Sequence, residues 1–131
     1  MILLDTHIWI WLVTKDPRLT GPIKGAIEGD IQTGLGLSVI SCWEVSKLVE
    51  RGRLSFSIPI TEWMEQALVY PGIQLLELTP KIAIESTELP GEFHRDPADQ
   101  IIVATARDHD IPLLTVDAQI LQYPHVKTSS V

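Results

Sequence analysis

Acidic side chains recur where short apolar runs of this chain give way to segments with helical patterns. Apolar runs at residues 2–4, 37–41 and 112–115 lead to Asp5, Glu44 and Asp117, and Asp96 with Asp99 opens an apolar helix that contains residues 100–104. If the runs are parallel strands, their carboxyl ends share one edge of a sheet, and ligands bind in the crevice there. Acids that converge on this edge would form a divalent-metal site of the kind that hydrolyses phosphodiesters.

Electrostatic repulsion decides what such a cluster requires. Two like charges 4 Å apart repel by roughly 4 kcal/mol at an effective dielectric constant of 20. Three or four carboxylates can therefore share a site only if a cation binds among them or if some of them stay protonated. Oxygen ligands favour Mg²⁺ or Mn²⁺ over zinc, which prefers histidine and cysteine. We therefore predict one or two Mg²⁺ or Mn²⁺ ions.

Each acid also has a structural explanation, and the residues alone leave it open. Segment 41–44 (Ser-Cys-Trp-Glu) matches a capping box in which Glu44 reaches back to the start of a helix. Asp96 precedes Pro97 and is well placed to cap a helix that begins there. Asp5 and Asp117 could cap the helices after them in the same way.

Strand-like runs alternate with helical patterns along the chain, which predicts a parallel sheet built from βαβ units. We expect strands near 2–5, 36–40, 73–78, 112–116 and 125–128. Helices are expected near 6–14, 21–29, 42–51, 61–70, 80–88, 97–109 and 118–122. No repeat or long linker divides the sequence, so we expect a single domain over residues 1–131.

Composition narrows the function further. A formal charge of −7 argues against a protein that coats nucleic acid, although bound cations could reverse the local potential of a nuclease. With one cysteine, Cys42, the chain has no disulfide framework. No apolar run is long enough to span a membrane, and Asp5 interrupts the N-terminus too early for a signal peptide. We expect a cytoplasmic protein.

At this point the sequence resembles a known family, the PIN domain, and within it the VapC-type toxins of toxin–antitoxin modules. The matching motifs follow one another in order: 3–7 (Leu-Leu-Asp-Thr-His), 41–45 (Ser-Cys-Trp-Glu-Val), 94–99 (His-Arg-Asp-Pro-Ala-Asp), and 113–117 (Leu-Leu-Thr-Val-Asp). Together they cover nearly the whole chain. Gln100 departs from the pattern, since related toxins often carry arginine there.

The resemblance implies a three-layer α/β/α fold and a metal-dependent endoribonuclease whose products carry a 5′ phosphate and a 3′ hydroxyl. It places the catalytic, metal-binding tetrad on Asp5, Glu44, Asp99 and Asp117. Asp96 belongs to the same motif and is expected to support these ligands from behind.

Several neighbours of the acids are candidates for supporting roles. Thr6 and Thr115 stand beside acids and could hydrogen-bond a metal ligand or its water. Arg95, with His94, could contact a substrate phosphate, because arginine binds phosphate through two parallel hydrogen bonds. The alternative for this pair is local packing in a loop. His7 is interpreted as structural.

Two tryptophans two positions apart, Trp9 and Trp11, bear on assembly. On a helix such positions face different directions, so both cannot enter one core stripe, and we expect an interface there. Aromatic residues are favoured at interface centres. A toxin also requires an inhibitor, and an acidic pocket would attract a basic side chain. We therefore predict a homodimer that binds an antitoxin, whereas Trp43 and Trp63 need only core packing.

Two rival functions remain at this stage. A catalytically silent, binding-only relative would share every motif, and only an activity assay separates it. A receiver-like signalling module also gathers acids and Mg²⁺ at strand ends, but it needs an acidic neighbour for Asp5 and a lysine after the last strand. The sequence has neither.

Overall fold

A four-stranded parallel sheet forms the centre of the fold, in a computed structural model that describes residues 1–129. The strands are β1 (Ile2–Leu4), β2 (Leu35–Ser38), β3 (Ile73–Leu76) and β4 (Leu113–Leu114). Their order is β3-β2-β1-β4, and Leu3 of β1 lies opposite Gly36 on one side and Leu113 on the other. This arrangement confirms the predicted parallel sheet.

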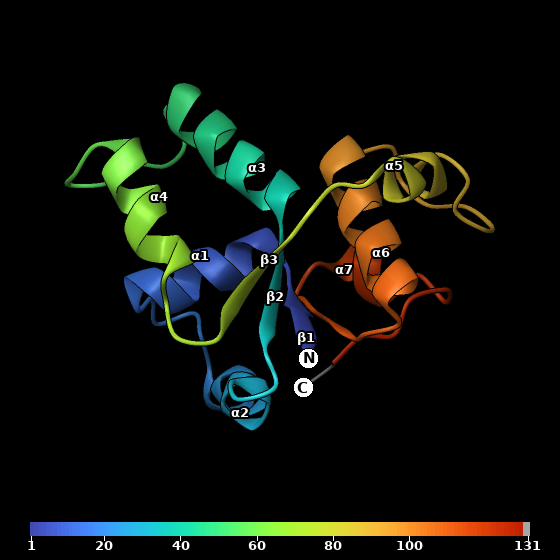
Figure 1. Ribbon diagram of the computed structural model, residues 1–131, viewed down its shortest axis with the longest axis horizontal. Coiled ribbons are helices and arrows are strands. Elements are labelled where there is room, and N and C mark those ends of the chain that lie inside the picture. The colour runs from blue at the N-terminus through green and yellow to red at the C-terminus, as the bar shows by residue number, and fades with distance from the viewer. Residues whose placement is uncertain (130–131) are drawn as a thin grey trace.

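Helices cover both faces of the sheet (Figure 1). One side carries α1 (Thr6–Thr14), α2 (Gly21–Asp30), α3 (Val39–Glu50) and α4 (Ile60–Leu68); the other carries α5 (Pro80–Ser86), α6 (Pro97–His109) and α7 (Ala118–Leu121). Side-chain alternation in β1 explains the division, since Ile2 and Leu4 join the first core whereas Leu3 packs with Ile102 in the second. The three-layer α/β/α architecture is confirmed.

Helix α3 begins at Val39, three residues earlier than the predicted start at residue 42. Ser38 caps it, because its side chain accepts a hydrogen bond from the Ile40 N–H. The predicted capping box around Ser41 and Glu44 is therefore wrong, and both residues lie inside the helix with their side chains available for other contacts. Two β-branched residues, Val39 and Ile40, made the sequence pattern look like a continuing strand.

The strand predicted near 125–128 is also wrong. A single bridge between Leu113 and Thr128 takes its place, held by hydrogen bonds from Leu113 N to Lys127 O (2.9 Å) and from Ser129 N to Leu113 O (3.0 Å). Pairing does not extend upstream because residues 124–126 form a turn. The His125 carbonyl is used elsewhere, since it accepts a hydrogen bond from Arg107.

Three of the four tryptophans, Trp9, Trp11 and Trp43, differ from the predictions in their burial. Trp9 is 0% and Trp11 8% exposed, so this chain buries both in its own core, and the interface argument drawn from them is wrong. Helix α1 buries more than one of its sides because it lies between the sheet and other helices. The Trp9 indole N–H, for example, donates to the Ala67 carbonyl of α4 (3.3 Å). Trp43 was expected in the core, yet it is 48% exposed on α3. Trp63 is buried, as predicted.

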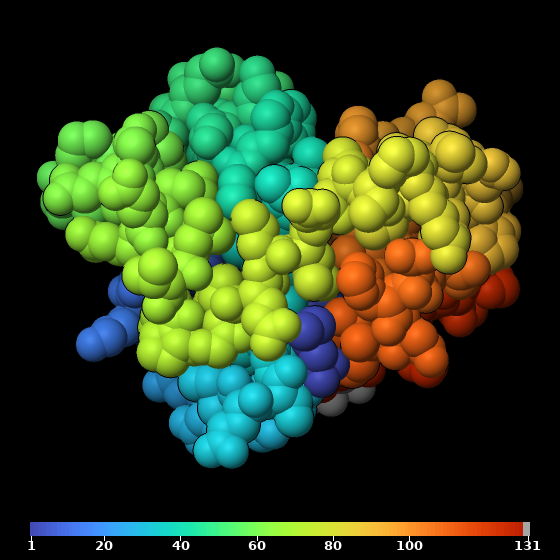
Figure 2. Space-filling model, viewed as in Figure 1, coloured from blue at the N-terminus to red at the C-terminus, as the bar shows by residue number. Residues whose placement is uncertain are grey.

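Strand β3 forms one edge of the sheet and exposes part of its apolar surface. Leu75 and, after the strand, Leu78 are exposed. The register pairs Ser38 with Leu76, so exposed Val39 at the start of α3 lies at the same end of the sheet. Figure 2 shows β3 and the segment after it uncovered next to α3. Within residues 1–129, no helix combines the length and apolar character that a membrane crossing requires.

Candidate metal centre

Asp5 and Asp117 follow β1 and β4, whereas Asp96 follows the loop between α5 and α6, and all three cap the helices that come next. Asp5 caps α1, Asp96 caps α6 and Asp117 caps α7, each accepting hydrogen bonds from backbone N–H groups of the first turn. An acid can therefore cap a helix and also belong to the acid site, because a carboxylate has two oxygens and can cap with one of them. Glu44 reaches the same region from the second turn of α3, which packs against α6.

Asp5 is held rigidly at the end of the central strand. One carboxylate oxygen accepts from the Thr6 N–H (2.9 Å), and the other accepts from the Thr115 hydroxyl (2.6 Å). Thr115 also accepts from the Asp117 N–H at 3.0 Å, so one threonine links two of the acids. Burial raises the pKa of the Asp5 carboxyl above its ordinary value, while these hydrogen bonds oppose the rise.

Thr6 connects α1 to α3. Its hydroxyl donates to a carboxylate oxygen of Glu44 and lies 2.8 Å from the Ser41 hydroxyl. A hydroxyl carries one proton, so Ser41 must donate to Thr6 while Thr6 donates to Glu44. Ser41 was not predicted to take part in the site. The available signal was its position three residues before Glu44, which places both side chains on one face of a helix.

The closest group of acids consists of Glu44, Asp96 and Asp99. Each offers one carboxylate oxygen, and these oxygens all lie within 4.8 Å of one another. Asp96 therefore lies within the same cluster as Glu44 and Asp99, and it also accepts the cap bond from the Asp99 N–H (3.1 Å). A set of carboxylate oxygens at this spacing suits a hard divalent cation such as Mg²⁺ or Mn²⁺.

Burial and neighbouring negative charges dominate the electrostatics of the group. Burial, followed by the negative charges of Asp5, Asp96, Glu44 and Asp117, raises the pKa of Asp99 to about 8. Burial also raises the pKa of Glu44 to about 7; the hydrogen bond from Thr6 opposes this rise, and the charges of Asp5 and Asp96 add to it. A bound cation would reverse both effects, because it favours the ionised carboxylates.

Asp5 and Asp117 stand at the border of this group, outside the 4.8 Å cluster. Both are nevertheless close enough for their charges to raise the pKa of Asp99. One carboxylate oxygen of Asp117 accepts hydrogen bonds from two N–H groups in the first turn of α7, those of Gln119 (2.8 Å) and Ile120 (3.2 Å). Its other oxygen accepts no hydrogen bond among those found in residues 1–129 and could serve a ligand directly or through water.

The two residues before Asp96 behave differently from each other. Arg95 is exposed in the loop that leads into α6. His94 turns inward, with its Nε2 atom 3.0 Å from a carboxylate oxygen of Asp99. The His94 carbonyl accepts a hydrogen bond from the Gln100 side chain (3.1 Å). Gln100, which departs from the family pattern, therefore holds the loop before α6 in place. His7 is exposed on the first turn of α1, near enough to Asp5 to lower its pKa.

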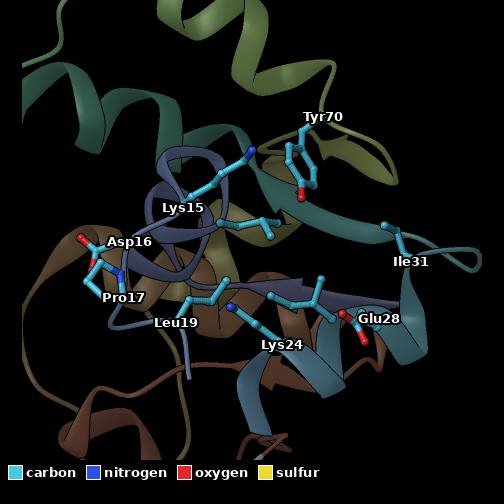
Figure 3. A pocket seen from close by; sticks show the side chains of 10 residues that line it. Lys15, Asp16, Pro17, Leu19, Lys24, Glu28, Ile31 and Tyr70 are labelled. Atoms are coloured by element: carbon cyan, nitrogen blue, oxygen red, sulfur yellow. The ribbon is translucent and has the colours of Figure 1, made fainter. Parts of the chain in front are cut away.

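A hollow of about 400 Å³ elsewhere shares no residue with the acids. It lies between the end of α1, α2 and the segment before β3, and Figure 3 shows Lys15 and Tyr70 on one side of it with Lys24 and Glu28 on the other. Its charges are mixed in sign and offer no cluster of carboxylates. The chemistry expected from the sequence therefore belongs at the sheet edge.

Comparison with known proteins agrees with this geometry. The PIN domain matches residues 2–126. The ribonuclease VapC22 of Mycobacterium tuberculosis is 32% identical over 130 residues, covering 99% of this chain and 97% of the relative. A toxin–antitoxin complex from Klebsiella pneumoniae contains a chain that is 25% identical, with a TM-score of 0.67 over 98% of this chain and 97% of that one.

A chain of VapBC2 from Rickettsia felis, solved with a DNA fragment from its promoter, has the same fold at 17% identity. Its TM-score is 0.74, and the match covers 98% of each chain. Fold, order of motifs and a near full-length relative all agree with the resemblance noted in the sequence. The chain belongs to the PIN-domain family, among its VapC-type members.

Proposed function

We propose that this chain is a metal-dependent endoribonuclease and the toxin of a toxin–antitoxin module, with residues 1–131 acting as one domain in the cytoplasm. The observation that carries the proposal is the cluster of Glu44, Asp96 and Asp99, whose oxygens lie within 4.8 Å of one another. The ribonuclease relative and the toxin–antitoxin neighbour support the activity and the biological setting.

The tetrad Asp5, Glu44, Asp99 and Asp117 would hold one or two Mg²⁺ or Mn²⁺ ions, with Asp96 as a further oxygen donor. Bound ions of this kind supply a nucleophilic water at neutral pH and stabilise charge on the leaving oxygen. The chain contributes positioning. Thr115 fixes Asp5, while Ser41 and Thr6 fix Glu44, so the carboxylates need little rearrangement when a cation arrives.

The substrate would be RNA and the inhibitor an antitoxin protein. An acidic pocket attracts a basic side chain, so we propose that an arginine or lysine of the antitoxin enters it and competes with the metal. We also propose a homodimer. Because Trp9 and Trp11 are buried, its support now comes from the exposed apolar side chains at the β3 edge and on α3, namely Val39, Trp43, Leu75 and Leu78.

The test is RNA cleavage by the purified chain with Mg²⁺, with Mn²⁺, or with EDTA. We expect cleavage with either metal, none in EDTA, and none from Asp99→Asn. Asp110→Asn is a matched control, because Asp110 is exposed beyond the far end of the same helix and its left-handed backbone (φ 51°) suits asparagine. Cleavage that survives EDTA or Asp99→Asn contradicts the proposal, and a well-folded chain that cleaves nothing is the binding-only relative.

A further inference from the structure

A second cavity, of about 520 Å³, shares Thr115 with the border of the candidate metal centre. It lies between α1, the start of α2 and the segment that joins β4 to α7. Thr115 is common to the cavity and to the acid site, since it lines the cavity and its hydroxyl donates to Asp5 at 2.6 Å. A ligand bound at the acids would therefore have this cavity within reach of its next chemical group.

One wall of the cavity carries a flat cation that is already fixed in place. The Arg18 guanidinium donates to Asp16 through Nε (3.0 Å) and through an Nη atom (2.8 Å). Its central carbon lies over the Trp11 ring, 4.9 Å from the ring centroid. The side chain is nevertheless 67% exposed. A guanidinium held by two hydrogen bonds and one aromatic ring retains an open surface on which a second planar group can stack.

The remaining wall is apolar and partly open. Ile23 is buried beneath the cavity, whereas Val116 and Leu121 at its border are 47% and 41% exposed. Val116 stands between Thr115 and Asp117, so this apolar surface adjoins two residues of the acid site. An exposed apolar surface beside a fixed planar cation matches a ligand with a flat, uncharged, aromatic body.

We propose that this cavity binds a nucleobase of the RNA strand next to the phosphodiester held at the acids. The inference rests on the proposed function, because the cavity gains this role from its continuity with the metal centre. RNA bases that are splayed out of the strand stack on aromatic rings and on arginine planes, and the sugar–phosphate chain stays outside. Arg18 also supplies positive charge next to an acidic site, where an incoming phosphate strand needs it.

The test separates base binding from cleavage. Metal-free protein labelled with ¹⁵N is titrated with the nucleoside 5′-monophosphates AMP, CMP, GMP and UMP, and separately with ribose 5-phosphate, which lacks a base. We expect at least one nucleotide to shift the amide signals of Thr20, Val116 and Leu121, and ribose 5-phosphate to leave them in place. Arg18→Ala should weaken nucleotide binding about tenfold, because it removes a side chain on which the base would stack.

Two further variants sharpen the result. Lys24→Ala removes the same charge nearby on α2 but outside the cavity, and should bind nucleotides like wild type. Leu121→Trp fills the cavity at an exposed position and should abolish the shifts. The inference is overturned if ribose 5-phosphate shifts the same signals, if no nucleotide does, or if Arg18→Ala and Leu121→Trp bind nucleotides like wild type. Failure here with intact RNA cleavage leaves the proposed function standing, whereas absence of cleavage refutes that function independently of the titration.

Discussion

Replacing Asp99 with asparagine should stabilise the metal-free protein while destroying its proposed activity. Asp99 is only 15% exposed and has a pKa of about 8, against 3.8 for an ordinary aspartic acid. At pH 7 the folded chain must protonate this group, at a cost on the order of 4 kcal/mol (about 1.4 kcal/mol for each pH unit above 3.8). Asparagine is neutral and avoids that cost. We expect a gain of about 2 kcal/mol or more in the free energy of unfolding, since the amide packs less favourably than the protonated acid.

The pH dependence has a definite sign. Because the pKa is higher in the folded than in the unfolded chain, the folded chain binds more protons between about pH 4 and pH 8. Wild-type stability should therefore fall as the pH rises through this window, and the difference from Asp99→Asn should shrink toward pH 4. Glu44, with a pKa of about 7, contributes in the same direction and leaves a weaker residual slope in the variant.

Urea denaturation in EDTA at pH 5 and pH 7.5 measures both quantities. Asp110→Asn serves as the control, because its lysine partner lowers the pKa of Asp110 and the variant should gain no stability. Added Mn²⁺ should then stabilise wild type but not Asp99→Asn, since a ligand stabilises only the state that binds it. If Asp99→Asn is no more stable than wild type at pH 7.5, or if wild type shows no loss of stability with rising pH, the reasoning from buried like charges is wrong.

Three further expectations follow from particular contacts. Asp96→Ala should lose roughly 0.5–2 kcal/mol of stability relative to Asp96→Asn, because only asparagine can keep the cap bond from Asp99 N. Asp96→Asn should be more stable than wild type without metal, because it removes a charge that raises the pKa of Asp99 and of Glu44, and it should bind Mn²⁺ more weakly, as denaturation and calorimetry would show. His94→Ala should weaken Mn²⁺ binding about tenfold by calorimetry because it frees the Asp99 carboxylate, while His109→Ala at the exposed end of α6 should not. Trp11→Glu should unfold the chain at lower temperature by circular dichroism, because it places a charge in the core, and a variant as stable as wild type would contradict the observed burial.

Several features of the fold could be predicted because they depend on local patterns. Alternation of apolar and helical segments gave the parallel sheet, and the caps at Asp5, Asp96 and Asp117 follow from residue type and position. The same patterns misplaced the start of α3, since Val39 and Ile40 suit a strand, whereas the structure places them in the first turn of the helix that Ser38 caps. The periodicity of apolar residues does not show where a helix begins when a single side-chain cap sets its first residue.

The sequence predicts that Thr6 and Thr115 could hydrogen-bond a metal ligand, and each donates to a candidate ligand, but the partner of each depends on tertiary structure and could not be predicted. Nothing local indicates that Thr6 donates to Glu44, or that Thr115 donates to Asp5, because each pair is far apart in sequence. The burial of Trp9 and Trp11 likewise depends on helices that cover α1 from different sides. Exposure of Trp43 has the same origin, since the face of α3 that carries it is left uncovered.

The central claim is that the acids at this sheet edge bind a divalent metal ion. Anomalous X-ray diffraction from crystals soaked in Mn²⁺ tests this claim most directly, because the anomalous scattering of manganese is much stronger than that of the protein atoms. We expect an anomalous peak surrounded by carboxylate oxygens of Glu44, Asp96 and Asp99, within reach of Asp5 or Asp117, and absent from crystals of Asp99→Asn. A manganese peak elsewhere with this cluster empty, or an unchanged peak in Asp99→Asn, would contradict the account.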